Sequence, residues 1–280
     1  MINLEKGLYI ISTPIGNLDD LSFRAKKILG MVDFIICENP LHSLKLLNKL
    51  GIKKKMFSLH DYNEEFLIKR IEKYQNNSSI ALISDAGSPL ISDPGYNLVK
   101  DFIKKKLKIT TLPGPSSIIS ALQLSGLPIN SFEFHGFVPK NKSGIVSLVN
   151  KIENLKTTSV YFVSGSRLLI FLESLCEMKM SRNISICKEM TKKNERVFRG
   201  NPRDLIHILS ENSNNYKGEF VVVIEGNINH LNKKIDKKTE EQITKLLKKF
   251  SLTDVVEIVH KLSSISKKEI YNSALLLKND

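Results

Sequence analysis

Cysteine is scarce in this chain of 280 residues, which holds only three, Cys37, Cys176 and Cys187. No two of them form a Cys-x-x-Cys pair, and their spacing matches no metal-binding motif. The six histidines show no metal-ligand spacing either. We therefore expect no metal, and we expect the thiols to be small buried side chains of a protein from a reducing compartment.

Long apolar runs are missing as well. No stretch approaches the ~18 consecutive apolar residues of a membrane-spanning helix, and the N-terminus lacks a secretory signal pattern. A cytoplasmic protein without membrane association is the expectation. Hydrophobic residues make up 41% of the chain and charged residues 25%, the usual balance for a globular protein. The length is sufficient for two α/β domains.

The signatures of several common enzyme classes are absent. The chain has no Gly-x-x-x-x-Gly-Lys-[Ser/Thr] phosphate loop, no Gly-x-Gly-x-x-Gly after its first apolar run, and no His-Glu-x-x-His zinc motif. The Gly-x-Ser-x-Gly elbow of hydrolases is missing too. These absences argue against a P-loop nucleotidase, a dinucleotide-dependent dehydrogenase, a zinc protease and an α/β-hydrolase.

Acidic residues are outnumbered by basic ones. The chain has 42 Lys and Arg against 29 Asp and Glu, which gives a net charge of +13. Such an excess favours acidic partners, with nucleic acid as the first candidate and an anionic membrane surface as the second. A general enrichment in lysine, without any binding role, is the alternative.

Short apolar runs alternate with amphipathic stretches through the first half of the chain. Strands are predicted at 8–12, 33–37, 53–59, 80–83 and 107–112, and helices at 19–30, 41–50, 64–74, 97–106 and 118–124. Asp93 is expected to cap the fourth of these helices, with Pro94 in its first turn. Short links between alternating strands and helices predict an α/β layer with a largely parallel sheet.

Tight loops rich in Gly, Pro and small residues follow these predicted strands. They are Thr13-Pro-Ile-Gly-Asn, Glu38-Asn-Pro, Ser84-Asp-Ala-Gly-Ser-Pro and Leu112-Pro-Gly-Pro-Ser-Ser. Ligands of parallel sheets bind at the carboxyl ends of the strands. The loops therefore predict a ligand held mostly by backbone groups, such as a sulfonium or nucleoside-like compound. Ordinary connecting turns are the alternative for the 84–95 stretch.

The composition changes around Phe137-Val-Pro-Lys-Asn-Lys-Ser-Gly144, which makes this stretch the best linker candidate. Further strands at 159–163, 184–188 and 219–225, with helices at 145–155, 168–178 and 204–210, predict a second α/β unit. From about residue 232 the chain is Lys-rich and helical, with capping-box spacing at Ser251 and Ser266. We predict two α/β domains, 1–136 and 137–231, with a ligand cleft between them, and a helical extension, 232–280.

Six stretches, in this order and spacing, resemble one family. They are Leu8-Tyr-Ile-Ile-Ser-Thr-Pro-Ile-Gly-Asn-Leu, Ser84-Asp-Ala-Gly-Ser-Pro-Leu-Ile-Ser-Asp-Pro-Gly, Leu112-Pro-Gly-Pro-Ser-Ser, Gly136-Phe-Val-Pro-Lys, Lys188-Glu-Met-Thr-Lys and Lys217-Gly-Glu-Phe-Val-Val-Val-Ile-Glu-Gly. Over roughly residues 7–227 the chain resembles the small-subunit ribosomal RNA methyltransferase I family of the tetrapyrrole methylase superfamily. The resemblance implies S-adenosylmethionine as methyl donor, a homodimer of two-domain chains, and 2′-O-methylation of a cytidine in the decoding region of 16S ribosomal RNA.

The resemblance also implies roles for residues of this chain. The donor-binding set is Thr13, Pro14, Ile15, Gly16, Asp85, Ala86, Gly87, Ser88, Ser116, Ser117, Phe162 and Met190. The basic positions that could face RNA phosphates are Lys140, Lys142, Arg167 and Lys192. Glu38 and Asp61 are the candidate bases for the ribose hydroxyl. Each of these two carboxylates could instead only cap the turn or helix that follows it.

The chain departs from the family pattern at several positions. Asn39-Pro-Leu41 stands where Asp-Thr-Arg is usual, Val163 where Glu is usual, and Ser166 where His is usual. Donor binding should persist because its loops are intact, whereas RNA positioning and catalytic efficiency are expected to suffer. Three functions stay open. They are an rRNA methyltransferase, a methylase of a tetrapyrrole or other small molecule, and a non-catalytic RNA-binding ribosome-assembly factor. The small-molecule enzyme has no need for the basic charge.

Overall fold

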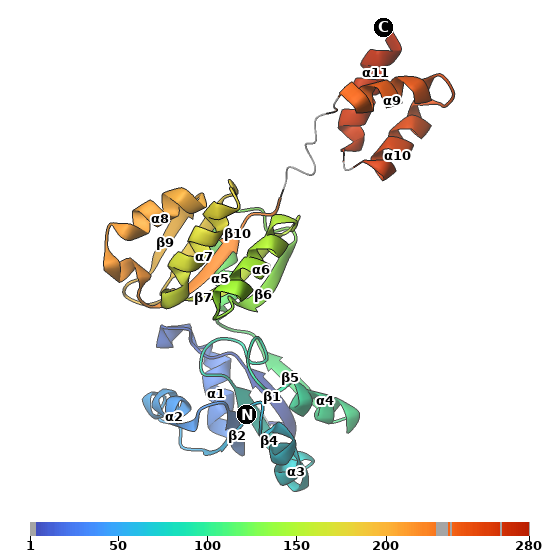
Figure 1. Ribbon diagram of the computed structural model, residues 1–280. Helices are drawn as coiled ribbons and strands as arrows, with labels where there is room; N and C mark the ends of the chain where they lie inside the picture. Colours follow the sequence, from blue (N-terminus) through green and yellow to red (C-terminus); the bar gives the residue numbers. More distant parts are fainter. Residues whose placement is uncertain (1–3, 228–234, 236, 264, 280) are drawn as a thin grey trace.

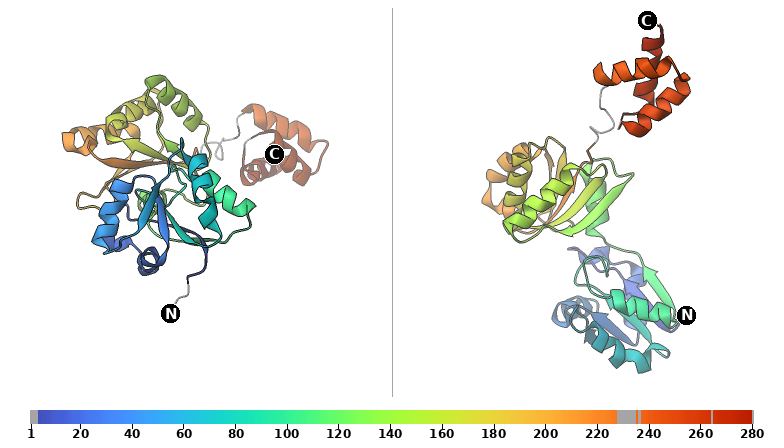
Figure 2. Two further views of the ribbon diagram at one scale, coloured as in Figure 1. Left: turned by 90° about the horizontal axis from the view of Figure 1, so that it is seen from below. Right: turned by 45° about the vertical axis from the view of Figure 1, so that its right-hand side comes forward.

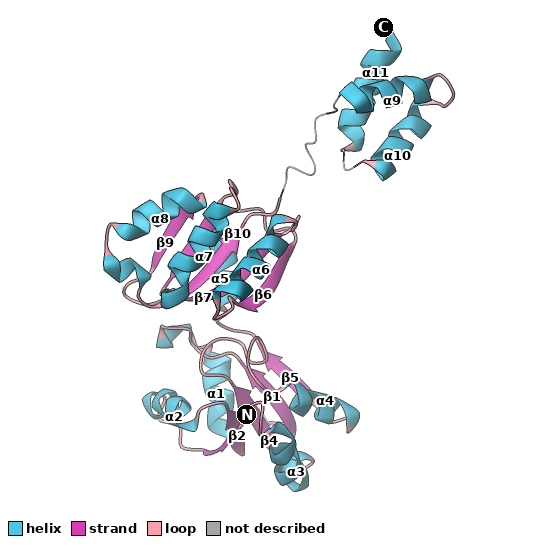
Figure 3. Ribbon diagram, viewed as in Figure 1, coloured by secondary structure: helices cyan, strands magenta, loops and turns pink. Residues whose placement is uncertain are grey.

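The structure is a computed structural model, and it describes residues 4–227, 235, 237–263 and 265–279. Two α/β units follow one another, and a cluster of three helices lies apart from both of them (Figures 1 and 2). Figure 3 shows that each unit has one sheet with helices packed against it. No helix in the described ranges is long and apolar enough to cross a membrane.

The first sheet is parallel throughout and has the strand order β3-β2-β4-β1-β5. Its strands are β1 (Gly7–Ile11), β2 (Phe34–Cys37), β3 (Lys55–Ser58), β4 (Ser79–Ile83) and β5 (Ile109–Leu112). The central strands β2 and β4 are buried along their whole length. Strands buried on both faces have continuous apolar sequences, which is why these runs were visible in the sequence. The predicted parallel sheet is confirmed.

Helices cover both faces of this sheet. They are α1 (Phe23–Met31), α2 (Pro40–Lys49), α3 (Glu64–Gln75) and α4 (Tyr96–Lys104). Leu29 of α1 packs with the odd-numbered side chains of β1, whereas Ile71 of α3 and Phe102 of α4 pack with the even-numbered ones. Because side chains alternate between the faces of a strand, β1 supplies both cores. Because the five strands are parallel, their carboxyl ends all lie at one edge of the sheet.

Two predicted helix starts in the first unit are wrong. Residues 18–20 form a separate 3-10 turn, η1 (Leu18–Asp20), and α1 begins only at Phe23, where the Ser22 hydroxyl accepts the Ala25 N–H. The helix α4 begins at Tyr96, with Gly95 and not Asp93 at its N-cap. Gly95 has φ +128°, and a Cβ there would lie 2.9 Å from a Leu90 methyl group. The chain therefore needs glycine at this bend before it can enter the helix.

The second sheet is mixed, with the strand order β6-β7-β10-β8-β9. Its strands are β6 (Phe132–Phe137), β7 (Thr158–Ser164), β8 (Ile184–Lys188), β9 (Arg196–Gly200) and β10 (Glu219–Ile224). The β6–β7 pair is parallel and the other pairs are antiparallel. The sequence did not predict β6 and β9. Both are edge strands with largely exposed or half-buried residues, so neither carries the apolar run of a buried strand.

The second sheet also has helices on both faces. They are α5 (Ser117–Ser125) on one face, and α6 (Lys142–Glu153), α7 (Gly165–Glu177) and α8 (Pro202–Ser210) on the other, followed by the 3-10 turn η2 (Ser213–Tyr216). Although α5 follows directly from β5, its Ala121 packs against Val221 of β10. The chain thus enters the second unit at α5, and the boundary predicted between residues 136 and 137 falls inside β6.

The C-terminal helices form a cluster with its own core. They are α9 (Lys237–Leu247), α10 (Leu252–Leu262) and α11 (Lys267–Asn279). Ile243, Val255 and Ile270 are buried among one another. Ser251 accepts the Asp254 N–H and Ser266 accepts the Glu269 N–H, each at 3.2 Å. Both predicted helix starts are therefore correct. The start of the predicted extension, residues 232–234, lies outside the described residues.

Candidate functional site

A cavity of about 360 Å³ lies between the two sheet units. The first unit contributes the loop after β4 and the residues that lead from β5 into α5. The second unit contributes side chains from β6, β7 and β10 and from the turn after β8. The cavity therefore sits at the carboxyl edge of the parallel sheet, which is the usual ligand position in such folds.

Thr13 joins the loop after β1 to the loop after β4. Its N–H donates to the Gly87 carbonyl at 2.8 Å, and the Gly87 N–H donates back to the Thr13 carbonyl at 3.0 Å. The buried Thr13 hydroxyl donates to the Ser84 carbonyl at 3.1 Å. Gly87 has φ +80°, and a Cβ there would meet Ile15 Cγ2 at 3.4 Å, so the bend requires glycine. Thr13 thus holds the cavity loop in place without lining the cavity itself.

Serine side chains connect the loops after β4 and β5. The Ser88 and Ser12 hydroxyl oxygens lie 3.0 Å apart, and the Ser88 hydroxyl donates to the Pro115 carbonyl at 3.4 Å. Ser116 and Ser117 line the cavity where α5 begins. The first backbone N–H groups of a helix have no partner within the helix, and the helix dipole favours negative charge there. This part of the cavity suits a carboxylate of a ligand.

The wall from the second unit is apolar. Phe162 lines the cavity and contacts Phe134 and Phe137 edge-on, with ring centroids 4.8 and 5.1 Å away. Met190 lines the cavity from the turn after β8 and is itself buried. Aromatic and thioether side chains offer flat, polarisable surfaces to a ligand ring. The wall therefore suits the apolar part of a ligand.

Strained backbone flanks the cavity on both sides. Leu90 and Ser92 have φ of +74° and +68°, and they flank Ile91, which lines the cavity. Glu189 and Thr191 have φ of +49° and +65°, and they flank Met190. Non-glycine residues rarely adopt positive φ, and such strain concentrates at functional sites. Each strained pair turns one apolar side chain toward the cavity.

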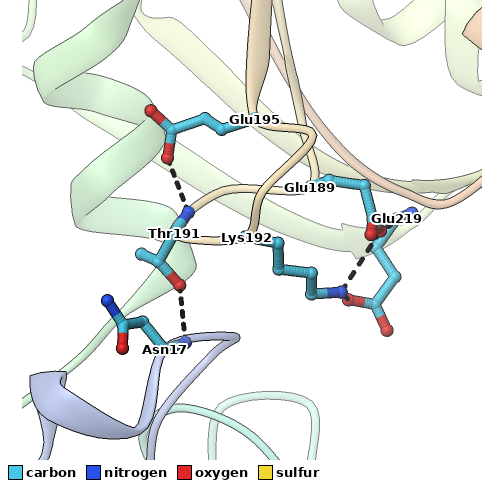
Figure 4. A network of polar contacts seen from close by, with 6 residues as sticks. All are labelled: Asn17, Glu189, Thr191, Lys192, Glu195 and Glu219. Carbon is cyan, nitrogen blue, oxygen red and sulfur yellow. Dashed lines mark hydrogen bonds and ion pairs between the residues drawn. The ribbon is translucent and has the colours of Figure 1, made fainter.

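A polar network ties the turn after β8 to the first unit (Figure 4). The Asn17 N–H donates to the Thr191 hydroxyl at 3.1 Å, and the Thr191 N–H donates to Glu195. Lys192 Nζ lies 3.2 Å from Glu189 Oε1 and 2.7 Å from Glu219 Oε2. Burial acts to lower the pKa of Lys192, but its hydrogen bonds to the two carboxylates outweigh burial and raise it. The charge of this predicted RNA contact is therefore compensated within the chain.

Gly16 brings the two units close together beside this network. A Cβ on Gly16 would lie 2.5 Å from Lys192 Cγ and 2.8 Å from Thr191 Oγ1. Only a residue without a side chain permits this approach. Gly16 is therefore a contact between the units, and like Thr13 and Pro14 it is not part of the cavity wall.

Four carboxylates gather at the cavity edge of the first sheet. Burial, with Glu38 and Asp85 nearby, raises the pKa of Asp93 to about 6, although a hydrogen bond with Ser84 opposes the shift. Burial, with Asp85 and Asp61 nearby, raises the pKa of Glu38. Like charges close together favour the protonated forms. Asp85 and Asp93 line the cavity, and Glu38 and Asp61 lie beyond them toward β3.

Asp85 has an unsatisfied oxygen in this group. Its Oδ2 lies 3.5 Å from Nδ1 of His42, whereas its buried Oδ1 has no partner among the described residues. An unpaired buried carboxylate oxygen is costly and is usually satisfied by a ligand or water. The cavity is the space that this side chain lines. Asp85 is thus available to accept hydrogen bonds from a ligand.

The family model described as Tetrapyrrole (Corrin/Porphyrin) Methylases matches residues 7–206. The chain belongs to the tetrapyrrole methylase family. Several similar proteins carry the name "Ribosomal RNA small subunit methyltransferase I". The protein from Halalkalibacterium halodurans is 40% identical over 225 residues, covering 80% of this chain and 77% of that protein. The protein from Rickettsia prowazekii is 38% identical over 275 residues and covers 96% of both chains.

Solved structures of tetrapyrrole methylase fold agree with the architecture. A diphthine synthase superposes with a TM-score of 0.59 at 16% identity, covering 78% of this chain and 89% of that one. A uroporphyrin-III-C-methyltransferase from Thermus thermophilus gives a TM-score of 0.54 at 16% identity, with coverages of 79% and 94%. At this level of identity the likeness concerns the fold. It confirms the two-domain α/β class that the sequence predicted.

Most of the donor-binding residues that the family resemblance predicted meet at the cavity. The nine that line it are Ile15, Asp85, Ala86, Gly87, Ser88, Ser116, Ser117, Phe162 and Met190. Thr13, Pro14 and Gly16 do not line it. The assignment of all twelve as donor-binding residues stays a prediction. The structure shows that nine of these residues line one cavity.

The predicted RNA-binding residues are more dispersed. Lys140 and Lys142 are exposed at the start of α6. The Arg167 guanidinium donates to the Val138 carbonyl at 2.8 Å, so part of its donor capacity is used within the second unit. The capping alternatives for the two candidate bases are not observed. Asn39, and not Glu38, is the N-cap of α2. Asn63, and not Asp61, is the N-cap of α3, and its side-chain oxygen accepts the His60 N–H.

Several cavity residues were not among the predicted donor-binding set. They are Ile91, Ser92, Asp93, Ile118, Phe137, Val163, Ser164, Gly218, Glu219, Phe220 and Val221. The Ser92-Asp93 pair was detectable in principle, because it continues the motif that begins at Ser84. The side chains of β7 and β10 were not, because their position depends on how the second sheet faces the first. Val163, where the family resemblance predicts Glu, lines the cavity at the end of β7 and is also part of the buried core with Tyr161 and Leu168.

Proposed function

We propose that this chain transfers a methyl group from S-adenosylmethionine to the 2′-oxygen of a cytidine in the decoding region of small-subunit ribosomal RNA. The observation that carries the proposal is the cavity between the units, built by the loops that the sequence shares with the family. Relatives that cover 96% of this chain carry the name of a small-subunit rRNA methyltransferase. The net charge of +13 suits a polyanionic acceptor.

The residues of the cavity fit this methyl donor. A volume of about 360 Å³ is within the usual range for small-molecule sites. Backbone groups of the loop after β4 and the start of α5 offer hydrogen bonds, Phe162 and Met190 offer apolar surface, and Asp85 has an oxygen to be satisfied. When bound, the donor supplies an electrophilic methyl group on a sulfonium. Asp85, Ser116 and Ser117 would hold its polar ends, and Phe162 and Met190 would pack against it.

The chain's own contribution to the reaction is positioning and proton acceptance. The two loops and the apolar wall fix where the ribose oxygen must arrive, and such orientation is a large part of catalysis. Glu38 and Asp61 remain the candidate bases for the 2′-hydroxyl proton, and Asp93 joins them because it lines the cavity. Burial and neighbouring carboxylates raise the pKa of Glu38 and Asp93. A raised pKa makes a carboxylate a better proton acceptor.

The acceptor and the assembly belong to the same proposal. We infer that Lys140, Lys142 and Arg167 face the phosphates, that the working unit is a homodimer, and that the protein acts in the cytoplasm, where small ribosomal subunits are made. Lys192 is the weakest of the predicted phosphate contacts, since Glu189 and Glu219 already neutralise it.

Two observations keep a non-catalytic ribosome-assembly factor as the second candidate. Val163 lines the cavity where the family pattern has Glu. Asn39-Pro-Leu41 lacks the Asp and the Arg of the family's Asp-Thr-Arg. Small subunits from a strain lacking this modification, incubated with methyl-labelled S-adenosylmethionine and the protein, distinguish the two. We expect label on one ribose 2′-oxygen of the decoding region, mapped by nuclease digestion and mass spectrometry. Subunit binding with no label would favour the assembly factor.

A further inference from the structure

The most exposed apolar side chains of the two sheet units share one edge. In the described part of these units they are Tyr62 (98% exposed), Phe23 (86%), Leu41 (76%), Tyr96 (70%) and Phe66 (67%). Each lies at or just before the first turn of a helix that follows a strand of the parallel sheet. These helices return antiparallel to the strands, so their first turns lie at the carboxyl edge, beside the cavity. Scattered exposed apolar residues are ordinary, but this grouping is not scattered.

Tyr62 lies in a turn that hydrogen bonds hold in place, whereas the other four residues lie in helices. Asn63 donates from its backbone to the His60 carbonyl at 3.0 Å and from its side-chain amide to the Ser58 carbonyl at 3.0 Å. The Asn63 side-chain oxygen accepts the His60 N–H at 2.9 Å. These three bonds close a tight turn with Tyr62 at its tip. The ring is almost fully exposed, and its described ring contact is a tilted one with His60 at 6.4 Å.

The turn is placed beside the carboxylates. The Leu59 N–H donates to the Cys37 carbonyl at 2.9 Å, and the Ser58 hydroxyl donates to the Glu38 carbonyl at 3.0 Å. These bonds tie the chain before Tyr62 to the residues that lead into Glu38. Along the edge, the order is therefore the cavity at β4, then Glu38 at β2, then Asp61 and Tyr62 at β3.

When the ribose of a nucleotide reaches the cavity, its base no longer stacks on the neighbouring bases of the RNA. A 2′-oxygen can approach a small enclosed site only if the nucleotide is splayed out of its stack, and splayed bases are commonly stacked on aromatic side chains. With the ribose oxygen near the carboxylates, a base directed along the edge toward β3 would reach Tyr62. Tyr62 is an uncovered ring on a hydrogen-bonded turn on that side.

We propose that Tyr62 is the stacking platform for the base of the methylated nucleotide and so positions the acceptor ribose. This inference rests on the proposed function. Stacking needs the ring but not the hydroxyl group. The contribution of one aromatic side chain to base stacking corresponds to about a 5- to 150-fold change in affinity. The effect should fall on acceptor binding, because Tyr62 does not line the donor cavity.

Methyl transfer to unmodified small subunits tests the proposal with Tyr62→Ala, Tyr62→Phe and Tyr62→Trp. We expect the Ala variant to raise KM for subunits about 5- to 150-fold with donor affinity unchanged by calorimetry, and the Phe and Trp variants to stay within about 3-fold of wild type. Ile103→Ala is the matched control, because Ile103 is 63% exposed at the opposite end of α4. It should behave as wild type.

Three outcomes overturn the stacking role. The first is an unchanged KM for subunits in Tyr62→Ala. The second is a rise in KM in Tyr62→Phe as large as in Tyr62→Ala, which would assign the effect to the hydroxyl group. Loss of dimers in Tyr62→Ala by light scattering, with KM restored at high protein concentration, would make the ring a contact between copies of the chain. If wild type transfers no methyl group to subunits, the proposed function itself fails. Transfer by wild type with normal KM in the Ala variant removes only the role of Tyr62.

Discussion

Replacing Asp93 with Asn should stabilise the first unit above neutral pH and not below pH 4. In the folded chain the pKa of Asp93 is about 6 against 3.8 for an ordinary Asp, because the carboxyl is half-buried beside Glu38 and Asp85. Folding therefore favours the protonated form. The stability that this form confers is fully present below pH 3.8 and is lost as the pH rises through about 6. Asn has no charge to desolvate, so the variant avoids that loss.

The magnitude follows from the difference between the two pKa values. A difference from 3.8 to about 6 corresponds to about 3 kcal/mol at full strength. Solvent screens a half-exposed group, so we expect about 1 kcal/mol for Asp93→Asn at pH 8. The Ser84 hydrogen bond opposes the shift, and Asn keeps an oxygen that can accept it. The gain should be near zero at pH 4.

Hydrogen exchange of the β4 amides measures this gain. Wild type and Asp93→Asn are compared at the same pH, so the intrinsic exchange rates cancel, and slow exchange of a central strand reports unfolding of the unit. Methyl transfer is measured in parallel. We expect the variant to lose activity while it gains stability, as at other strained active sites. A stability difference of the same size at pH 4 and pH 8 would refute the electrostatic explanation.

The remaining predictions concern the loops and the contact between the units. Gly87→Ala should destabilise by about 1–2 kcal/mol, because φ is +80° there, and should weaken donor binding by calorimetry; donor affinity within twofold of wild type would contradict this. Asp85→Ala should weaken donor binding, whereas Glu38→Ala should spare it and slow single-turnover transfer; the reverse pattern would exchange their roles. Lys192→Met should remove the ion pairs of Glu189 and Glu219 and increase exchange of the 188–195 peptide, with a larger effect at low salt. Equal exchange in the variant would show that the ion pairs contribute nothing.

The sequence predicted best the elements whose burial follows a regular pattern. It placed a strand at 33–37, where the structure has β2 at Phe34–Cys37, and a helix at 64–74, where α3 spans Glu64–Gln75. A fully buried strand shows a continuous apolar run, and an amphipathic helix shows apolar positions three and four apart, so both patterns are local. The strands β6 and β9 were missed because an edge strand needs neither pattern. Their existence is decided by β7 and β8, which offer them hydrogen bonds.

The candidate site was predictable only where one segment both forms a loop and lines the cavity. Asp85 to Ser88 satisfy both conditions, and their motif revealed them. Thr13 and Gly16 belong to an equally visible motif, yet one supports a loop and the other lets the units approach. Their roles depend on contacts across 71 and more residues of sequence, such as the bond from the Thr13 hydroxyl to the Ser84 carbonyl. A motif therefore predicted that a residue lies near the site, but it did not predict which groups the residue contacts.

The two strained segments suggest why the site is assembled from separate units. In the loop after β4 the strain at Leu90 and Ser92 is opposed by the packing of Leu90 near Gly95. In the turn after β8 it is opposed by the hydrogen bonds of Glu189 to Glu219 and of Thr191 to Asn17 and Glu195. Strained backbone persists only where surrounding contacts over-determine it. Because Thr191 draws one of those contacts from the first unit, the position of Met190 depends on both units being in place. A ligand that fills the cavity would touch both segments at once, so its binding should be coupled to the contact between the units.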